Sequence, residues 1–241
     1  MTEKKKGVWI TGASSGIGRA AAIEFARAGF VVYASSRRIT ELERLNADLV
    51  PENLDVKIFP CNVASSANVD QTVKKIIAAG QIDCLVNNAG ITSFKKAELN
   101  SIKEINDIIN TNLLGSIYSI KHILPHMIEN GGGTIINLLS IVTKKIFTES
   151  SAYAASKMGL LGYTNSLREE VRKYRIKIIN IIPGATETPM WPPDVRKENS
   201  GKMMTSADIG RLIVWLYLQR GNMVTEEIVV RPITGDIGEN E

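Results

Sequence analysis

The regular alternation of short apolar runs with longer segments of helical periodicity constrains the fold of this chain more than any other feature. Such alternation is typical of units in which parallel strands are joined by helices that cover both faces of a sheet. The predicted strands span residues 7–10, 31–34, 57–60, 84–87, 134–138, 177–182 and 227–230. The predicted helices span residues 17–28, 40–49, 66–79, 99–130, 151–173 and 206–219. We therefore expect an α/β fold with a doubly wound parallel sheet of about seven strands and helices on both faces.

The chain shows no boundary between domains. No internal repeat, low-complexity segment or linker interrupts the alternation. We expect a single domain over residues 1–241, a length that one such sheet can occupy. Pro125 falls within the long helical segment 99–130, and we expect that helix to kink or break at the proline.

Composition is that of a globular protein and points to neither a nucleic-acid nor a membrane partner. Hydrophobic residues make up 44% of the chain and charged residues 22%. The net charge is +4, but the basic residues are scattered and no aromatic-basic stripe appears, so we do not expect nucleic acid to bind. No apolar stretch reaches the ~18 residues that a bilayer requires, and the N-terminal residues lack a signal-peptide core. Cys61 and Cys84 are too few for a disulfide framework, which favours a reducing, cytoplasmic location.

The run T-G-A-S-S-G-I-G at residues 11–18 follows the first predicted strand and opens the first predicted helix. Gly12, Gly16 and Gly18 lack Cβ atoms, so the backbone there can approach a pyrophosphate, and a helix N-terminus attracts its negative charge. We interpret the run as the phosphate-binding turn of a Rossmann-like dinucleotide fold. Taken alone, the run is also compatible with a glycine turn that only tightens the connection.

Tyr153 and Lys157 stand four residues apart in S-A-Y-A-A-S-K, with Ser140 thirteen residues upstream. This spacing puts the phenol and the ammonium on one face of a helix, where the positive charge is expected to lower the pKa of Tyr153. A tyrosine so placed can exchange a proton near neutral pH. By itself such a pair is more often a solvent-exposed neighbour pair on a helix.

Five motifs occur together in the order and at the spacings of one known family. They are Thr11-Gly12-x-x-x-Gly16-x-Gly18, Asn87-Asn88-Ala89-Gly90, Asn112, Ser140 with Tyr153 and Lys157, and Pro183-Gly184-x-x-x-Thr188. The chain thus resembles the short-chain dehydrogenase/reductase family, in its single-domain branch. The resemblance implies an NAD(P)-dependent oxidoreductase that acts on CH–OH groups and transfers a hydride between nicotinamide and a carbonyl or hydroxyl substrate.

The same resemblance assigns a catalytic role to four residues. Tyr153 is expected to be the general acid or base, Ser140 to hold the substrate oxygen, and Lys157 to bind the nicotinamide ribose. Asn112 is expected to position a water that connects Lys157 to solvent. The complete set expected to bind the cofactor is Gly12, Ser14, Ser15, Gly16, Ile17, Gly18, Ser36, Arg37, Asn62, Val63, Asn88, Ala89, Gly90, Tyr153, Lys157, Pro183, Gly184, Thr186 and Thr188.

The end of the second strand indicates which nicotinamide cofactor is used. An acidic residue there binds the ribose hydroxyls of NAD, whereas arginine receives the 2′-phosphate of NADP. The position expected for the acid is Ser36, followed by Arg37 and Arg38. We expect NADP to be preferred and NAD to bind less well, with Arg37 gripping the phosphate beside Ser36 and Ser15. A solvated surface charge is the alternative interpretation of Arg37.

Residues 189–205 depart from the alternation, with three prolines among mixed polar residues. We predict a mobile loop over the substrate site, because the side chains of Met190, Trp191, Met203 and Met204 need a surface to cover. A disordered insertion is the alternative.

Two further groups of residues allow a functional interpretation and an ordinary one. His122 and His126 have the spacing of metal ligands, but no third ligand is evident and we expect no metal site. Lys144 and Lys145 lie where relatives line the substrate pocket. Together with Arg196, Lys197 and Lys202 of the predicted loop, they either attract an anionic substrate or are solvated basic residues.

Two other functions compete with the main hypothesis. One is a non-catalytic NADP-binding sensor or scaffold, against which the presence of all four catalytic residues argues. The other is an epimerase or dehydratase, against which the glycine spacing and the short chain argue. By resemblance we expect a homodimer or homotetramer, paired through the last strand and its preceding helix or through the helices near 99–130 and 151–173. The sequence does not identify the substrate.

Overall fold

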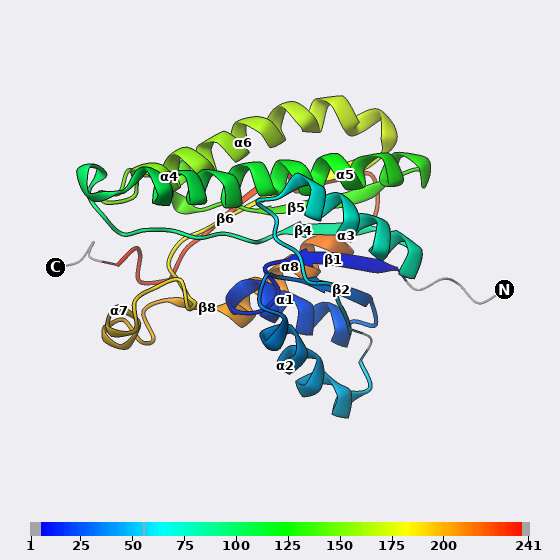
Figure 1. The fold of residues 1–241 in the computed structure, drawn as a ribbon, viewed down its shortest axis with the longest axis horizontal. Coiled ribbons are helices and arrows are strands. Elements are labelled where there is room, and N and C mark those ends of the chain that lie inside the picture. Colours follow the sequence, from blue (N-terminus) through cyan, green and yellow to red (C-terminus); the bar gives the residue numbers. More distant parts are fainter. Residues whose placement is uncertain (1–5, 55, 238–241) are drawn as a thin grey trace.

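Seven parallel strands form the central sheet of the computed structural model, which describes residues 6–54 and 56–237 (Figure 1). Their order across the sheet is β3-β2-β1-β4-β5-β6-β9. The strands are β1 (Gly7–Thr11), β2 (Val31–Ser35), β3 (Val56–Ile58), β4 (Cys84–Asn87), β5 (Gly133–Leu138), β6 (Ile176–Pro183) and β9 (Glu227–Val230). The strand order reverses between β1 and β4, and such switch points are where open α/β sheets bind ligands, beyond the carboxyl ends of the strands.

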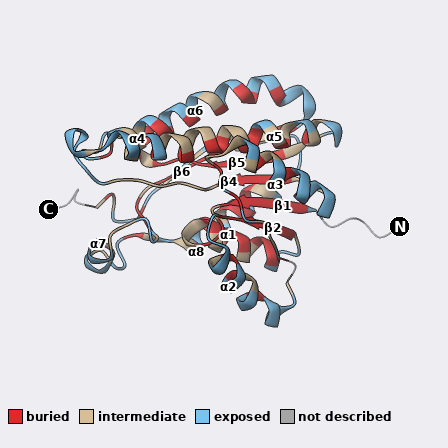
Figure 2. Ribbon diagram, in the orientation of Figure 1, coloured by how far each residue is buried: buried red, intermediate tan, exposed pale blue. Residues whose placement is uncertain are grey.

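Helices cover both faces of this sheet. They are α1 (Gly16–Arg27), α2 (Ile39–Leu49), α3 (Ser66–Ala79), α4 (Ile102–Ile108), α5 (Gly115–Glu129), α6 (Ser151–Val171), α7 (Pro193–Glu198) and α8 (Ser206–Leu218). In Figure 1, α3, α5 and α6 lie on one side of the sheet and α1, α2 and α8 on the other. The strands are therefore buried from both faces, as the red strands of Figure 2 show. The expected doubly wound, single-domain fold is confirmed.

The strand and helix positions follow the alternation of the sequence closely, but the predicted helix 99–130 is wrong as a single helix. The helical region begins at Ile102 and is interrupted by a π-helical turn over Ile109–Leu114. The helix does not break at Pro125, because α5 continues to Glu129. A proline removes one backbone hydrogen bond. Burial of the apolar face of α5 against α3 and the sheet outweighs that loss.

The segment 189–205 is partly regular. It contains the short helix α7 and the strand β8 (Met204–Thr205), which pairs in parallel with β7 (Thr186–Glu187). Trp191 Nε1 donates a hydrogen bond to the Thr186 carbonyl oxygen at 3.1 Å. These contacts fasten both ends of the segment to the chain just after β6, and its mobility stays a prediction.

Three buried asparagines form a hydrogen-bonded ladder across the adjacent strands β4, β5 and β6. Asn87 Nδ2 donates to Asn137 Oδ1 at 3.0 Å, and Asn137 Nδ2 donates to Asn180 Oδ1 at 3.1 Å. Asn180 Nδ2 donates in turn to Thr164 Oγ1 on α6 at 3.0 Å. Buried amides need partners, so this ladder favours one register of β4, β5 and β6 near their carboxyl ends.

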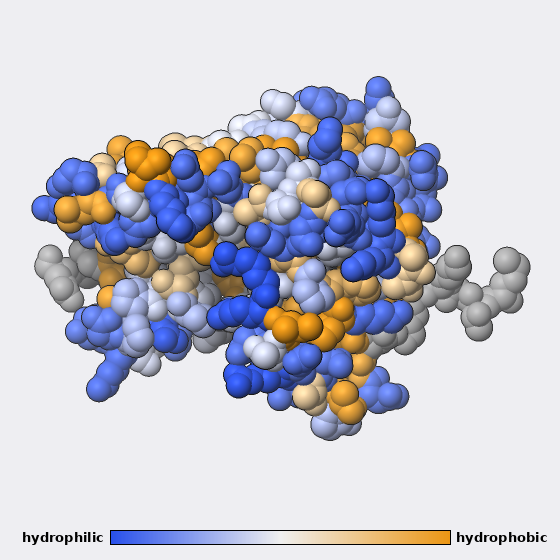
Figure 3. All heavy atoms as spheres, in the orientation of Figure 1, coloured by the Kyte–Doolittle hydropathy of each residue, from blue (hydrophilic) through white to orange (hydrophobic). Residues whose placement is uncertain are grey.

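The surface in view is largely hydrophilic, with apolar side chains gathered in smaller patches (Figure 3). None of the helices in the described part of the chain combines the length and the apolar character that a membrane span requires. The charged N-terminal residues 1–5, on which the expected location partly rests, lie outside the described residues.

Candidate active site

A cavity of about 740 Å³ opens at the carboxyl ends of the central strands. All the residues that the sequence assigns to catalysis or cofactor binding line it, except Gly18 and Asn112. Residues that directly follow β1 and β4, the last residues of β5 and β6, and residues of α6 thus meet at the switch point of the sheet. Their individual roles stay predictions.

The glycine-rich turn forms one wall of the cavity and has the conformation that glycine permits. Gly12 and Gly16 have φ values of +69° and +55°, which residues with a side chain rarely adopt. Gly18 lies behind the wall, where a Cβ atom would come within 2.3 Å of Asn88 Nδ2 and 2.5 Å of the Gly12 carbonyl oxygen. The turn therefore presents bare backbone and the N-terminus of α1 to the cavity, which fits a pyrophosphate.

Hydrogen bonds fix this turn to the end of β4. Thr11 Oγ1 accepts from the backbone N–H groups of Asn88 and Ala89, at 3.1 and 3.2 Å. Asn88 Nδ2 donates to the carbonyl oxygens of Thr11 and Gly12, at 3.0 and 3.2 Å. The cavity wall is thus held in place by the protein itself before any ligand binds.

A basic corner of the cavity lies beside the turn. Ser36, Arg37 and Arg38 all line it. The guanidinium of Arg38 donates to Ser14 Oγ at 3.1 Å and to Ser15 Oγ at 3.0 Å. The sequence reasoning assigned the phosphate to Arg37 and gave Arg38 no role. The position of Arg38 directly after Arg37 could have suggested a role in binding the phosphate. Only the folded chain shows that the Arg38 side chain reaches back to the glycine turn.

Tyr153, Ser140 and Lys157 meet in the same cavity. The phenol of Tyr153 is hydrogen-bonded to the Ser140 side chain. Lys157 Nζ lies 5.7 Å from the centroid of the Tyr153 ring and donates to the Leu138 carbonyl oxygen at 2.6 Å. Ser140 stands just after β5 and the other two residues lie on one face of α6, as their spacing predicted.

The expected effect of Lys157 on Tyr153 is wrong for the protein by itself. Burial raises the pKa of Tyr153, and the hydrogen bond with Ser140 offsets only part of that rise. Burial also lowers the pKa of Lys157 to about 8. The pKa of Tyr153 rises because the phenol itself is buried, and its loss of hydration disfavours the charged phenolate. At neutral pH Tyr153 is therefore a protonated phenol, ready to donate a proton.

Asn112 does not line the cavity but supports it from the π-helical turn. Its Oδ1 accepts from the Ile91 N–H at 2.8 Å, and its Nδ2 donates to the Ile91 carbonyl oxygen at 2.9 Å and to Ser156 Oγ at 3.0 Å. Ser156 Oγ donates in turn to the Tyr153 carbonyl oxygen at 2.7 Å. The amide thus links the loop after β4 to the first turn of α6.

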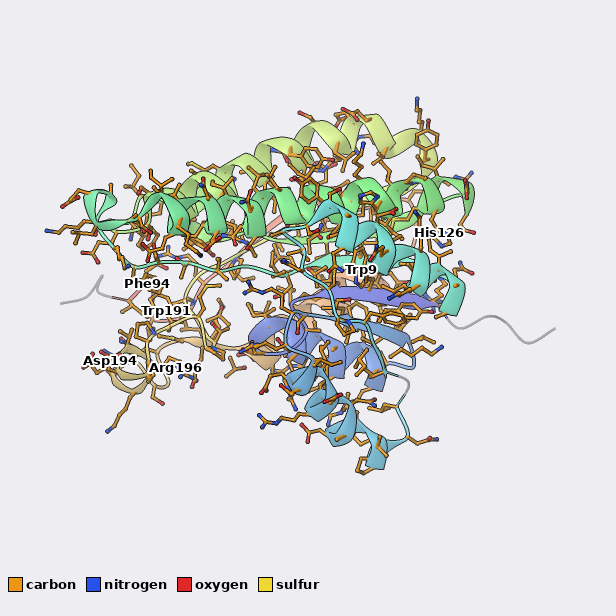
Figure 4. All side chains as sticks on the ribbon, viewed as in Figure 1. Trp9, Phe94, His126, Trp191, Asp194 and Arg196 are labelled. Carbon is orange, nitrogen blue, oxygen red and sulfur yellow. The ribbon has the colours of Figure 1, made fainter. Side chains whose placement is uncertain are left out.

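The cavity also contains an aromatic pair that the sequence does not predict. Phe94 and Trp191 both line it, and their rings stack with centroids 4.9 Å apart and planes 14° apart. Figure 4 shows the two side by side, one from the loop after β4 and the other from the segment before α7. The lid interpretation drew attention to Trp191, but nothing in the sequence pairs it with Phe94.

The basic residues beside the pocket have acidic partners. Lys144 Nζ lies 3.0 Å from a carboxylate oxygen of Glu227, and Lys145 Nζ lies 3.5 Å from a carboxylate oxygen of Asp236. Asp236 itself lines the cavity and forms an ion pair with Arg231 at 2.6 Å. These carboxylates offset the positive charge, so the arrangement gives little support to an anionic substrate.

The two histidines lie away from this site. His126 is at the opposite end of the molecule from Phe94 and Trp191 (Figure 4). His122 Nε2 is 3.0 Å from Ser66 Oγ. Within residues 6–54 and 56–237, no three histidine, cysteine, aspartate or glutamate side chains group as a metal site would require.

Comparison with known proteins agrees with this geometry. The family model described as short chain dehydrogenase matches residues 6–199. The chain belongs to the short-chain dehydrogenase family. As a short-chain dehydrogenase it is an oxidoreductase, and it is 36% identical over 236 residues to the sepiapterin reductase of Chlorobaculum tepidum, covering 95% of this chain and 96% of that protein.

Two solved structures of oxidoreductases share the fold over nearly the whole length. An alcohol dehydrogenase from the archaeon Thermococcus sibiricus, complexed with 5-hydroxy-NADP, has a TM-score of 0.86 and 26% identity, with 96% of this chain and 98% of that one covered. A metagenomic short-chain oxidoreductase in complex with NADP has a TM-score of 0.83 and 27% identity, with 94% of this chain and 96% of that one covered.

Proposed function

We propose that this chain is an NADPH-dependent reductase of carbonyl compounds, with Tyr153 as the general acid. The observation that carries the proposal is the meeting of Tyr153, Ser140 and Lys157 with the bare backbone of the glycine turn in one cavity. A bound nicotinamide supplies the hydride in such a reaction. The residues of this chain bind and orient the substrate and deliver the proton.

Each of the three side chains has a task that follows from its surroundings. Tyr153 is protonated at neutral pH and gives its proton to the substrate oxygen as negative charge develops there. Ser140 shares a hydrogen bond with the phenol, so its hydroxyl lies beside the same oxygen and stabilises the developing charge. Lys157 is buried with its Nζ 5.7 Å from the centre of the Tyr153 ring, and it adds positive potential in a region of low dielectric.

The preference for NADPH over NADH rests on the basic corner of the cavity. Ser36 stands where NAD-dependent enzymes need an acid, and Arg37 and Arg38 directly follow it. Arg38 already donates to Ser14 and Ser15, so its charge lies beside the glycine turn. Two solved relatives are complexed with NADP or a derivative of it, which supports the same choice.

The first substrate class to consider is a flat carbonyl compound. The stacked rings of Phe94 and Trp191 form an aromatic part of the cavity wall. A wall of this kind suits a planar ring system, because stacked aromatic groups gain about 0.5–1.5 kcal/mol beyond the area that they bury. The similarity to a sepiapterin reductase agrees with this choice, and we propose sepiapterin as the first substrate to test.

Replacement of Tyr153 by Phe tests the mechanism. We expect Tyr153→Phe to lower kcat for carbonyl reduction by at least about a hundredfold, because general acid catalysis contributes on the order of 10²–10⁴. Binding of NADPH, followed by its fluorescence, should stay within about twofold of the wild type, since only a hydroxyl is lost. Turnover is followed by the loss of NADPH absorbance with sepiapterin and small ketones.

Tyr163→Phe is the matched control, because Tyr163 lies on the same helix but does not line the cavity. It should leave kcat unchanged. Wild-type turnover by Tyr153→Phe would remove the residue from the mechanism. Tight NADPH binding by a wild-type protein that reduces no carbonyl compound would favour the non-catalytic sensor or scaffold instead.

Titration with both cofactors tests the preference. We expect NADPH to bind more tightly than NADH, and Arg37→Ala and Arg38→Ala each to weaken NADPH binding about tenfold while NADH binding changes little. Arg44→Ala, on the exposed side of α2, is the control that removes a charge outside the cavity. Tighter binding of NADH than NADPH by the wild type would overturn the assignment.

A further inference from the structure

Thr92 lines the cavity, and its hydroxyl oxygen is buried without a hydrogen-bond partner in the described part of the chain. Three side-chain polar atoms in the described part of the chain are buried and unpaired, namely Asn87 Oδ1, Thr92 Oγ1 and Arg196 Nε. Of these three residues, only Thr92 lines the cavity. A buried hydroxyl without a hydrogen bond is unfavourable, so such a group usually pairs with a ligand or an ordered water.

The backbone on the N-terminal side of Thr92 is held firmly. Both polar backbone groups of Ile91 are bound by the Asn112 side chain, at 2.8 and 2.9 Å. Asn112 is fully buried and also bound to Ser156, so this loop and the helix that carries Tyr153 share one brace. The backbone next to Thr92 is therefore held in place relative to the helix that carries Tyr153.

The loop that carries Thr92 is also fastened on its other side. The Lys95 N–H donates to the Glu149 carbonyl oxygen at 3.2 Å. Glu149 has a φ of +59°, an uncommon conformation for a residue with a side chain, and its neighbours Thr148 and Ser150 line the cavity. Strained backbone of this kind persists where surrounding contacts hold it, and it concentrates at functional sites.

The surroundings of Thr92 indicate the chemistry of the group that it meets. Two residues further along, Phe94 stacks with Trp191 and offers an apolar, aromatic surface. Ser140 and Tyr153 of the same cavity already hydrogen-bond each other. Thr92 adds a hydroxyl that can both donate and accept, at a place where the nearby wall is aromatic.

We propose that Thr92 is a specificity-determining residue that hydrogen-bonds a polar atom on the edge of a flat carbonyl substrate. The aromatic wall selects the plane of the substrate, and the Thr92 hydroxyl selects a nitrogen or oxygen on its rim. This inference rests on the proposed carbonyl reductase function and adds to it a substrate class, planar rings with polar edges.

Two variants of Thr92 test this contact. Thr92→Val keeps the shape and removes the hydroxyl, whereas Thr92→Ser keeps the hydroxyl. Binding of sepiapterin to the NADP⁺-loaded protein is measured by calorimetry, and kcat and KM are measured for sepiapterin and for butane-2,3-dione, a small dicarbonyl without a ring. We expect Thr92→Val to weaken sepiapterin binding and raise its KM about tenfold. Thr92→Ser should stay within about threefold, and the dione and NADPH binding should be unaffected.

Other results would overturn the proposed role of Thr92 or the proposed activity. Unchanged sepiapterin binding and KM in Thr92→Val would overturn the proposal, and a loss of NADPH affinity instead would move Thr92 to the cofactor site. A loss of kcat/KM for the dione as large as that for sepiapterin would show a merely structural effect and also overturn it. If the wild type binds sepiapterin but does not reduce it, the proposed activity fails while the binding test of Thr92 still holds. If it binds no sepiapterin, the proposed substrate class is overturned.

Discussion

At the scale of single residues, Lys157 places a charge in a buried position, and this charge should make the free energy of unfolding depend on pH. Its pKa falls from the usual 10.5 to about 8 because burial disfavours the charged form. The folded protein therefore releases this proton before the unfolded chain does. Below pH 8 the full cost of burying the charge is present, and it is relieved as the pH rises from about 8 to 10.5.

We expect the free energy of unfolding of the wild type to rise by about 2 kcal/mol between pH 7.5 and 10 relative to that of Lys157→Met. Urea denaturation of both cofactor-free proteins at the two pH values measures this difference, in which the titration of all other groups cancels to first order. Parallel pH dependences would mean that Lys157 keeps an ordinary pKa in the folded protein.

At the scale of elements, the connection between β1 and α1 depends on the absence of a side chain at Gly18. A Cβ atom there would meet the Asn88 side chain and the Gly12 carbonyl oxygen at distances of 2.3 and 2.5 Å. We expect Gly18→Ala to push the turn into the cavity, weaken NADPH binding at least about tenfold and cost about 1–3 kcal/mol of stability. Fluorescence titration and chemical denaturation measure the two effects.

Gly162→Ala is the matched substitution in another helix. Gly162 is exposed on α6, and nothing lies within 4 Å of the Cβ position. Because glycine is a poor helix former, alanine should stabilise the protein there by about 0.5–1 kcal/mol without changing NADPH binding. Equal effects of the two substitutions on NADPH binding would show that close packing at Gly18 does not determine the shape of the glycine turn.

At the scale of the whole molecule, exposed apolar residues on two faces support the expected homo-oligomer. Trp215 on α8 is 58% exposed and Val229 on the edge strand β9 is 47% exposed. On the other face, Met158 on α6 is 53% exposed. Single exposed apolar residues are common, but an open strand edge is a surface that proteins usually cover.

We propose a homodimer or homotetramer in solution, and light scattering after size-exclusion chromatography measures its mass. If α8 and β9 form the interface, Trp215→Lys should lower the mass while Met158→Lys leaves it unchanged. The reverse result would assign the interface to α6, and both variants would lower the mass of a tetramer that uses both faces. A monomeric wild type would contradict the expectation.

Much of this architecture could be predicted from the sequence, because periodicity is a local property. The apolar runs that became β4 and β9 end where they were expected to end, since each is bounded by polar or turn residues in the chain itself. The helix does not break at Pro125, because burial of its apolar face, which depends on distant residues, outweighs a local signal, and a kink there stays a prediction.

The sequence by itself determined the order of the elements, the bare glycine turn and the placing of Tyr153 and Lys157 on one face of a helix, because these depend on spacings of a few residues. Only the tertiary structure decided that Arg38 reaches the glycine turn, that Phe94 meets Trp191 and that burial raises the pKa of Tyr153. Contacts between distant segments, and the desolvation that they cause, arise from the packing of the whole chain and have no local pattern that predicts them.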